Sequence, residues 1–260
     1  MTLPAYLEQG EGDTAVFLLH GVGGGKQAWL SNQAVLAAAG FRTVAWDMPG
    51  YGASSPLSPC TNALLAAALK TLVAHIGAKR NVLLGHSMGG MIAQELAALH
   101  PALVHGLVLY STSPAFGKAD GAWQQTFLQS RFAPLDQGLG MDGLAGKIVP
   151  TMFAPGADPA RLAEAAALMG RVPAGSYRAA LAAIVSFNRL AELGHIAVPT
   201  LCLAGELDRN APPAVVEKMA SRIAGAHYEC LPGVGHIANI EQPALFNSAV
   251  LAFLKHHFPN

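Results

Sequence analysis

Short apolar runs alternate with longer Ala- and Leu-rich segments along most of this 260-residue chain. Each apolar run is nearly continuous, which is typical of a strand buried on both faces of a parallel sheet. The longer segments have helical spacing, so the order of elements predicts an α/β fold with a mostly parallel central sheet flanked by helices. The predicted strands are residues 15–20, 41–47, 81–85, 104–110, 198–204 and 228–231. The predicted helices between them are residues 62–75, 88–99, 213–223 and 243–257.

One long region interrupts this alternation. Residues 113–193 contain no convincing strand, and their helical segments (121–132, 159–169 and 176–190) are joined by loops rich in Pro and Gly. The sequence therefore predicts a core domain made of residues 1–112 and 194–260. Residues 113–193 are expected to form a helical cap, inserted between two strands and lying over one end of the sheet.

Composition excludes several classes of protein. Hydrophobic residues make up 52% and charged residues 12%, which argues against a disordered chain. Sixteen Lys and Arg balance sixteen Asp and Glu, so no basic face for nucleic acid is expected. The sequence has no apolar run of about 18 residues and no leader-like start, so we expect a cytoplasmic protein without a membrane span. The three cysteines have no CxxC spacing, so neither a disulfide framework nor a metal site is expected.

A glycine-rich loop, residues 20–26, follows the first predicted strand. Lys26 stands where a dinucleotide-binding loop needs its third glycine, and His20 and Gln27 break the phosphate-binding pattern. The sequence therefore predicts a tight turn whose backbone N–H groups face a pocket, and no nucleotide cofactor. In the next loop, Asp47 is expected to hold residues 48–52 in place.

The segment Gly85-His86-Ser87-Met88-Gly89 lies between a predicted strand and a predicted helix. In that context the G-x-S-x-G pattern is typical of a nucleophilic serine on a sharp turn, where side chains in place of the glycines would clash. We therefore predict that Ser87 projects alone at the carboxyl edge of the sheet. The His86 side chain is expected to point the other way.

A serine nucleophile needs a base, and the base needs an acid that orients it. His236 follows the last predicted strand and comes after Ser87 in the chain order typical of this pattern, which predicts that it is the base. Asp208 follows the strand before that and is the predicted acid. Glu206, two residues nearer that strand, is the local rival.

These ordered motifs resemble those of the α/β-hydrolase fold family, and the resemblance covers nearly the whole chain. It implies a serine hydrolase of the carboxylesterase or enol-lactonase group, without metal or cofactor. It also implies an oxyanion hole made by the backbone N–H groups of Val22 and Met88. The expected substrate is a small to medium, mostly apolar ester or lactone, cleaved through an acyl-enzyme.

Large apolar residues of the cap, and Trp29 beside the glycine loop, are candidates for the substrate pocket. Those predicted to bind substrate are Trp29, Trp123, Phe127, Phe153 and Phe187. Lys26 is expected to be a solvated loop lysine rather than a contact for an anionic substrate.

Other activities of the same fold stay open. C–C hydrolases of vinylogous 1,5-diketones also use a serine, and Arg189 resembles their substrate-binding arginine. However, His86 and Ile237 stand where those enzymes usually have Asn and Trp. A ligand receptor without turnover, or cofactor-free chemistry that does not need the serine, are further alternatives. The oligomeric state is not predicted.

Overall fold

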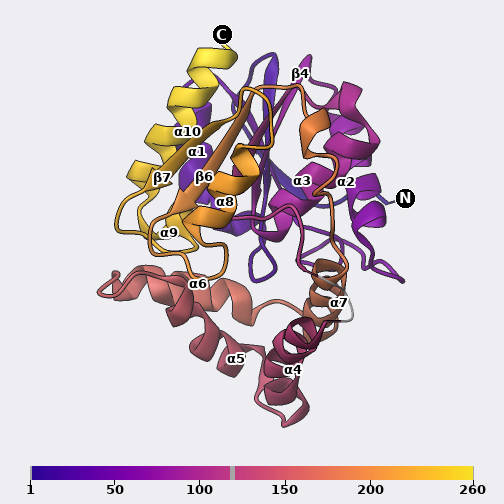
Figure 1. The fold of residues 1–260 in the computed structure, drawn as a ribbon, viewed down its shortest axis with the longest axis vertical. Helices are drawn as coiled ribbons and strands as arrows, with labels where there is room; N and C mark the ends of the chain where they lie inside the picture. Colours follow the sequence, from indigo (N-terminus) through magenta and orange to yellow (C-terminus); the bar gives the residue numbers. More distant parts are fainter. Residues whose placement is uncertain (1, 118–120, 260) are drawn as a thin grey trace.

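The computed structural model describes residues 2–117 and 121–259, whose strands form one seven-stranded sheet in the order β1-β3-β2-β4-β5-β6-β7 (Figure 1). Every neighbouring pair is parallel except β1 and β3, so the predicted α/β fold with a mostly parallel sheet is confirmed. The strands are β1 (Tyr6–Gln9), β2 (Thr14–Leu19), β3 (Arg42–Trp46), β4 (Arg80–His86), β5 (Gly106–Tyr110), β6 (Thr200–Gly205) and β7 (His227–Leu231).

Helices cover both faces of the sheet. Alternate residues of β2 point to opposite faces, so Phe17 and Leu19 pack in one core, while Val16 and Leu18 pack in another. The first core lies under α2 (Asn62–Ile76), α3 (Met88–Leu99) and α8 (Pro213–Ala220), and the second under α1 (Leu30–Ala38) and α10 (Pro243–His257). The remaining short helices of the core are η1 (Lys26–Trp29), η2 (Pro101–Leu103), η4 (Leu193–His195) and α9 (Ala238–Glu241).

Two elements of the core have no counterpart in the prediction. Strand β1 reads Tyr-Leu-Glu-Gln and is half exposed at the sheet edge, so it lacks the continuous apolar run that marks the buried strands. Helix α1 buries Asn32, Gln33 and Leu36, so two of its three buried residues are polar and its helical apolar pattern is weak.

Helices fill the described part of the segment between β5 and β6. They are α4 (Ala122–Asp136), α5 (Gly140–Ile148), η3 (Val149–Met152), α6 (Pro159–Gly170) and α7 (Ala174–Val185). In Figure 1 they lie together below the carboxyl ends of the parallel strands. Helix α5 was not predicted because it contains three glycines; it is held by packing of Met141, Leu144 and Ala145. The division into a core and a cap at residues 113 and 193 stays a prediction.

The two ends of this insertion are fastened to each other. Phe116 N–H donates to Phe187 C=O at 3.1 Å, and Arg189 N–H donates to Pro114 C=O at 2.7 Å. The prediction of a helix continuing to residue 190 is therefore wrong: α7 ends at Val185, and the chain then pairs with residues 114–116. No helix in the described residues is long and apolar enough to cross a membrane.

The backbone packs closely at the start of α3, and this contact gives a stability test. A Cβ atom on Gly89 would lie 2.1 Å from the Leu19 carbonyl oxygen, whereas one on Gly146, in α5, would meet nothing within 4 Å. We expect Gly89→Ala to lower the free energy of unfolding by at least about 2 kcal/mol. Gly146→Ala should raise it by about 0.5–1 kcal/mol, because alanine favours a helix.

Urea denaturation of the two variants beside the wild-type chain measures both changes. Equal midpoints for Gly89→Ala and the wild type would contradict the packing described at α3.

Candidate active site

Ser87 occupies the sharp turn between β4 and α3. Its backbone angles, φ of 52° and ψ of −116°, lie in a region that residues other than glycine rarely adopt. The turn is held by Ser87 N–H, which donates to Tyr110 C=O at 2.9 Å, and by the Thr112 hydroxyl, which donates to Ser87 C=O at 2.7 Å. A Cβ atom on Gly85 would lie 2.4 Å from the Gly89 oxygen, so the glycines of the motif are a steric requirement.

Asp208 and His236 meet after β6 and β7. Asp208 Oδ2 lies 2.8 Å from His236 Nδ1, and Oδ1 accepts the N–H groups of Asn210 and Ala211 at 2.8 and 3.0 Å. Burial raises the pKa of the Asp208 carboxyl, but the nearby His236 and these hydrogen bonds outweigh burial, and the net pKa is lowered. An ionised carboxylate only accepts, so His236 Nδ1 carries a proton, and in the neutral imidazole Nε2 is the acceptor nitrogen.

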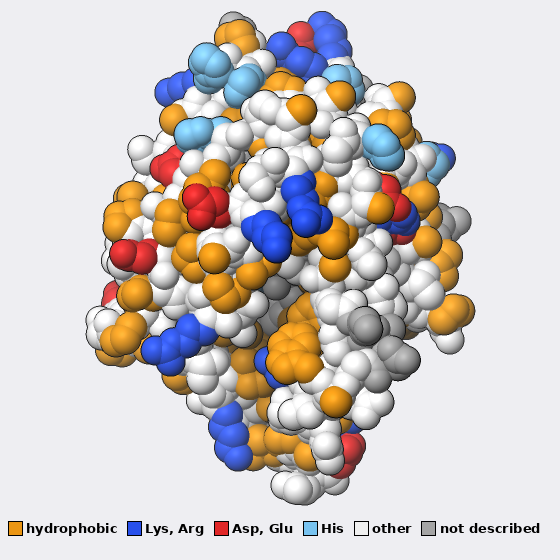
Figure 2. Space-filling model, viewed as in Figure 1, with side chains coloured by type: hydrophobic (Ala, Val, Ile, Leu, Met, Phe, Trp, Pro, Cys, Tyr) orange, Lys and Arg blue, Asp and Glu red, His pale blue; other side chains and the backbone are white. Residues whose placement is uncertain are grey.

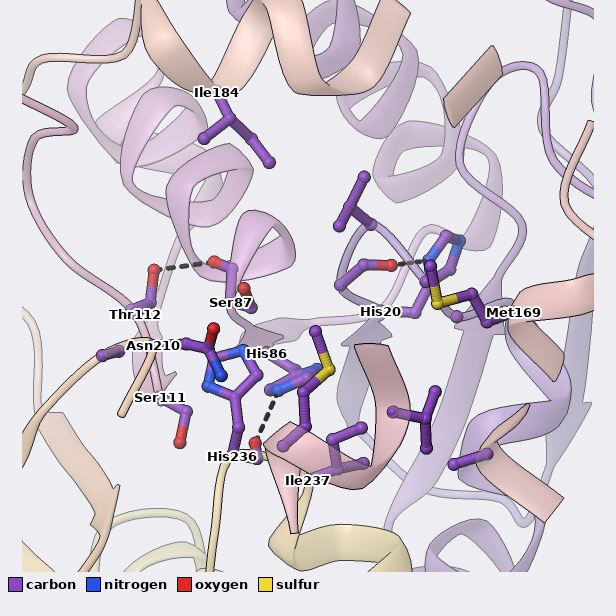
Figure 3. Close-up of a pocket in the computed structure, with 18 of the residues that line it drawn as sticks. His20, His86, Ser87, Ser111, Thr112, Met169, Ile184, Asn210, His236 and Ile237 are labelled. Atoms are coloured by element: carbon purple, nitrogen blue, oxygen red, sulfur yellow. Dashed lines mark hydrogen bonds between the residues drawn. The ribbon is translucent and has the colours of Figure 1, made fainter. Parts of the chain in front are cut away.

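Glu206, the rival acid, accepts Gly233 N–H at 2.7 Å and is exposed. It therefore holds a loop, and the structure brings Asp208, not Glu206, to His236. Ser87 and His236 face the same cavity (Figure 3).

His86 departs from the prediction that its side chain points away. Its ring lies 4.8 Å from the His236 ring, and its Nε2 lies 2.8 Å from the His236 carbonyl oxygen (Figure 3). A carbonyl only accepts, so Nε2 carries the proton. Burial and then the charge of His236 lower the pKa of His86 to about 3, so the ring is neutral. The Tyr110 hydroxyl donates to the same carbonyl at 3.0 Å, so two side chains fix the backbone of His236.

The glycine loop is held from several sides. Met48 N–H donates to His20 Nε2 at 3.0 Å, so the His20 proton sits on Nδ1, which donates to Gly21 C=O at 2.8 Å. The Tyr51 hydroxyl donates to Val22 C=O at 2.9 Å. Among the described residues, neither Val22 N–H nor Met88 N–H has an acceptor. Two N–H groups are therefore available at the positions that the family resemblance implies for an oxyanion hole.

The cavity lies between the sheet edge and the helical insertion, where Figure 2 shows the surface hollowed. Its volume is about 200 Å³, below the usual range for drug-sized ligands. Of the five predicted contacts, Trp29, Trp123 and Phe127 line it. The prediction is wrong for Phe153, which lines a separate pocket beside Glu206, and for Phe187, which is buried in the core.

A family model described as "alpha/beta hydrolase fold" matches residues 14–243. The chain belongs to the α/β-hydrolase fold family. It is 31% identical to a 2-hydroxy-6-oxononadienedioate/2-hydroxy-6-oxononatrienedioate hydrolase of Paraburkholderia xenovorans, over 96% of this chain and 90% of that protein. It is 34% identical to polyketide synthase ThaQ of Burkholderia thailandensis over 81% of this chain, which spans only 10% of that protein's length.

Among solved structures, an enol-lactonase from Burkholderia xenovorans superimposes with a TM-score of 0.85 and 28% identity. The match covers 96% of each chain. These relatives have different activities, so the family by itself does not choose a substrate.

Two charged side chains of this α/β-hydrolase chain make contacts that the sequence did not predict. Lys26 is neither solvated nor free for a substrate: both its backbone N–H and its ammonium group bind the Asp47 carboxylate. Asp47 also accepts Ala53 N–H at 3.4 Å, so it links the glycine loop to the following loop. Arg189 binds Glu95 of α3 with two hydrogen bonds of 2.7 Å and does not line the cavity.

The two buried histidines give a pH test. Burial lowers the pKa of His20 to about 4 and that of His86 to about 3. In the unfolded chain both take up a proton near pH 6.5, so between about pH 6.5 and 4 the unfolded chain binds more protons. The free energy of unfolding should therefore fall as the pH drops through this window. The lowered pKa of Asp208 acts only below about pH 3.8.

Urea denaturation from pH 7.5 to 4 measures this slope. The slope should be shallower in His86→Gln, whose amide can still donate to the His236 carbonyl, and unchanged in His195→Gln, at an exposed position. Parallel slopes for the wild type and His86→Gln would show that His86 is not the cause.

Proposed function

We propose that this chain is a serine hydrolase that cleaves a carboxylic ester or lactone of a small to medium substrate through an acyl-enzyme. The observation that carries the proposal is the contact between Asp208 Oδ2 and His236 Nδ1. That contact leaves His236 Nε2 as a base on the cavity that Ser87 also lines. The rigid turn at Ser87 and the lactonase and hydrolase relatives support the same assignment.

The proposed reaction begins when Ser87 Oγ attacks the substrate carbonyl and His236 Nε2 accepts the proton. Asp208 keeps the imidazole in the required tautomer and stabilises its positive charge. The N–H groups of Val22 and Met88 stabilise the oxyanion, at about 3 kcal/mol for each donor. His236 then gives its proton to the leaving oxygen, and later activates the water that releases the acid from Ser87.

The helical insertion, residues 113–193, acts in this proposal as a cap that closes the cavity over the substrate. It contributes Trp123 and Phe127, while Trp29 comes from the core. The small cavity favours short to medium acyl groups.

A second candidate is the hydrolysis of a C–C bond in a vinylogous 1,5-diketone, favoured by the similarity to the P. xenovorans hydrolase. In this chain Arg189 is engaged by Glu95 and Glu192, so it is not available as a substrate contact. A receptor without turnover is the remaining alternative, and a measured turnover number decides against it.

Hydrolysis of p-nitrophenyl esters from acetate to dodecanoate tests the proposal. We expect turnover that peaks at short to medium chains. Ser87→Ala should lower kcat by about 10⁴- to 10⁶-fold, because the nucleophile is lost. Ser221→Ala, at an exposed position after α8, is the matched control and should keep wild-type turnover. Turnover that survives in Ser87→Ala would refute the serine mechanism. Turnover confined to the diketone would favour the C–C hydrolase.

The anchoring of the glycine loop gives a separate test. Tyr51→Phe removes the hydroxyl that fixes the Val22 carbonyl, and thereby loosens the loop that carries Val22 N–H. We expect kcat to fall about tenfold with little change in KM, because the loop acts on the oxyanion and not on the bound ester. The control is Tyr228→Phe, whose hydroxyl contacts Pro213 C=O at the far edge of the sheet. A selective rise in KM would contradict this role.

A further inference from the structure

The cavity carries positive charge that the sequence alone did not predict. Its lining includes Arg131 and Arg209 but no Asp or Glu among the described residues. His20 and His86 also line it, but both are neutral because burial lowers their pKa values to about 4 and about 3. The permanent positive charge of the lining therefore comes from the two guanidinium groups, and His236, the proposed base, is the third histidine of the lining. A substrate that is apolar throughout would leave that charge without a partner.

Arg131 is the half-buried guanidinium of the two. Its Nη1 donates to the Phe127 carbonyl at 3.2 Å and to Ser130 Oγ at 3.0 Å, and its central carbon lies 3.6 Å from the centre of the Phe127 ring. The Tyr177 hydroxyl, from α7, is a further hydrogen-bond partner. All these partners are neutral. Arg131 is thus held in place on an aromatic wall, and its charge has no acidic partner among the described residues.

Three other arginines of the insertion each have an acidic partner, and Arg171 is exposed to solvent. Arg161 pairs with Glu164, Arg178 with Asp136, and Arg189 with Glu95. No described Asp or Glu pairs with Arg131. A guanidinium withdrawn from water without a counter-ion is costly, and the cost is recovered when an anion binds. A guanidinium also offers five N–H donors in a planar fork that fits a carboxylate.

We infer that the substrate carries a carboxylate at the end remote from the scissile carbonyl, and that Arg131 binds this carboxylate. This inference rests on the proposed function and deepens it. Ser87 and His236 lie at the sheet edge of the cavity, whereas Arg131 lies on α4 in the insertion. A substrate that spans the cavity places its ester or lactone at the first site and its carboxylate at the second. The apolar wall of Phe116, Trp123 and Phe127 packs against the carbon chain between them.

Matched esters test this assignment on the acyl side and on the alcohol side. The acyl pair is mono-p-nitrophenyl adipate against p-nitrophenyl hexanoate. The alcohol pair is 4-carboxyphenyl hexanoate against 4-(methoxycarbonyl)phenyl hexanoate. For each pair the measured quantity is the ratio of kcat/KM for the charged ester to that for the neutral ester. The wild-type ratio should exceed one by about 10- to 100-fold for one of the pairs, the range of a charge-assisted hydrogen-bonded contact.

Arg131→Met keeps an unbranched apolar chain beside Phe127 and should reduce that ratio to about one. Arg131→Lys keeps the charge but not the fork, and should give an intermediate ratio. Arg161→Met, on the same insertion but outside the cavity lining, should keep the wild-type ratio. Turnover of the neutral esters without a preference for either charged ester would overturn the inference and leave the serine hydrolase intact. So would a preference that Arg131→Met retains.

Binding separates this inference from a failure of the proposed chemistry. In the Ser87→Ala background, calorimetry should detect the charged ester of one of the two pairs binding more tightly than its neutral partner, and Arg131→Met should abolish the difference. That result with no ester turnover would refute the hydrolase proposal alone. Equal binding of the charged and the neutral ester in both pairs would refute the role of Arg131, whatever the turnover.

Discussion

The close approach of α3 to the end of β2 is the constraint on which the rest of the site depends. Only a glycine fits at Gly89, because the Leu19 carbonyl lies where a side chain would begin. This contact sets Ser87 in its rare backbone conformation and brings the glycine loop against the same turn. Val22 N–H and Met88 N–H, which have no acceptor among the described residues, lie in the two segments that this contact holds together. The geometry of the candidate site is thus a consequence of backbone packing.

The three histidines at the site differ in their surroundings. His236 has an ionised carboxylate on one ring nitrogen and lines the cavity, which is the environment that the proposed base requires. His20 and His86 are buried among groups that fix one neutral tautomer each, and they hold backbone segments in place. The same residue type serves as a base or as a structural donor according to the charge and the water around it.

The sequence predicted the buried strands and the order of Ser87, Asp208 and His236, because both depend on local signals: continuous apolar runs, and glycines around a serine. Strand β1 and helix α5 gave no such signal, since an edge position and tertiary packing create them. The sequence also could not predict where the side chains of His86 and Arg131 lie. His86 was predicted to follow its strand and is the last residue of β4, and the direction of its side chain depends on how the turn and β7 pack. Arg131 lies in a predicted helix, and only the fold shows that a wall of the cavity includes it.

The fastened ends of the insertion have a consequence for how this fold can change. The chain leaves the sheet at residues 114–116 and returns at residues 187–189, and backbone hydrogen bonds join these two segments. The Arg189 side chain also binds Glu95 and so connects this junction to α3. Helices beyond the junction can lengthen, shorten or exchange residues without disturbing the register of β5 and β6. The part of the cavity lining that the insertion contributes can therefore change independently, while packing against the sheet constrains the turn at Ser87.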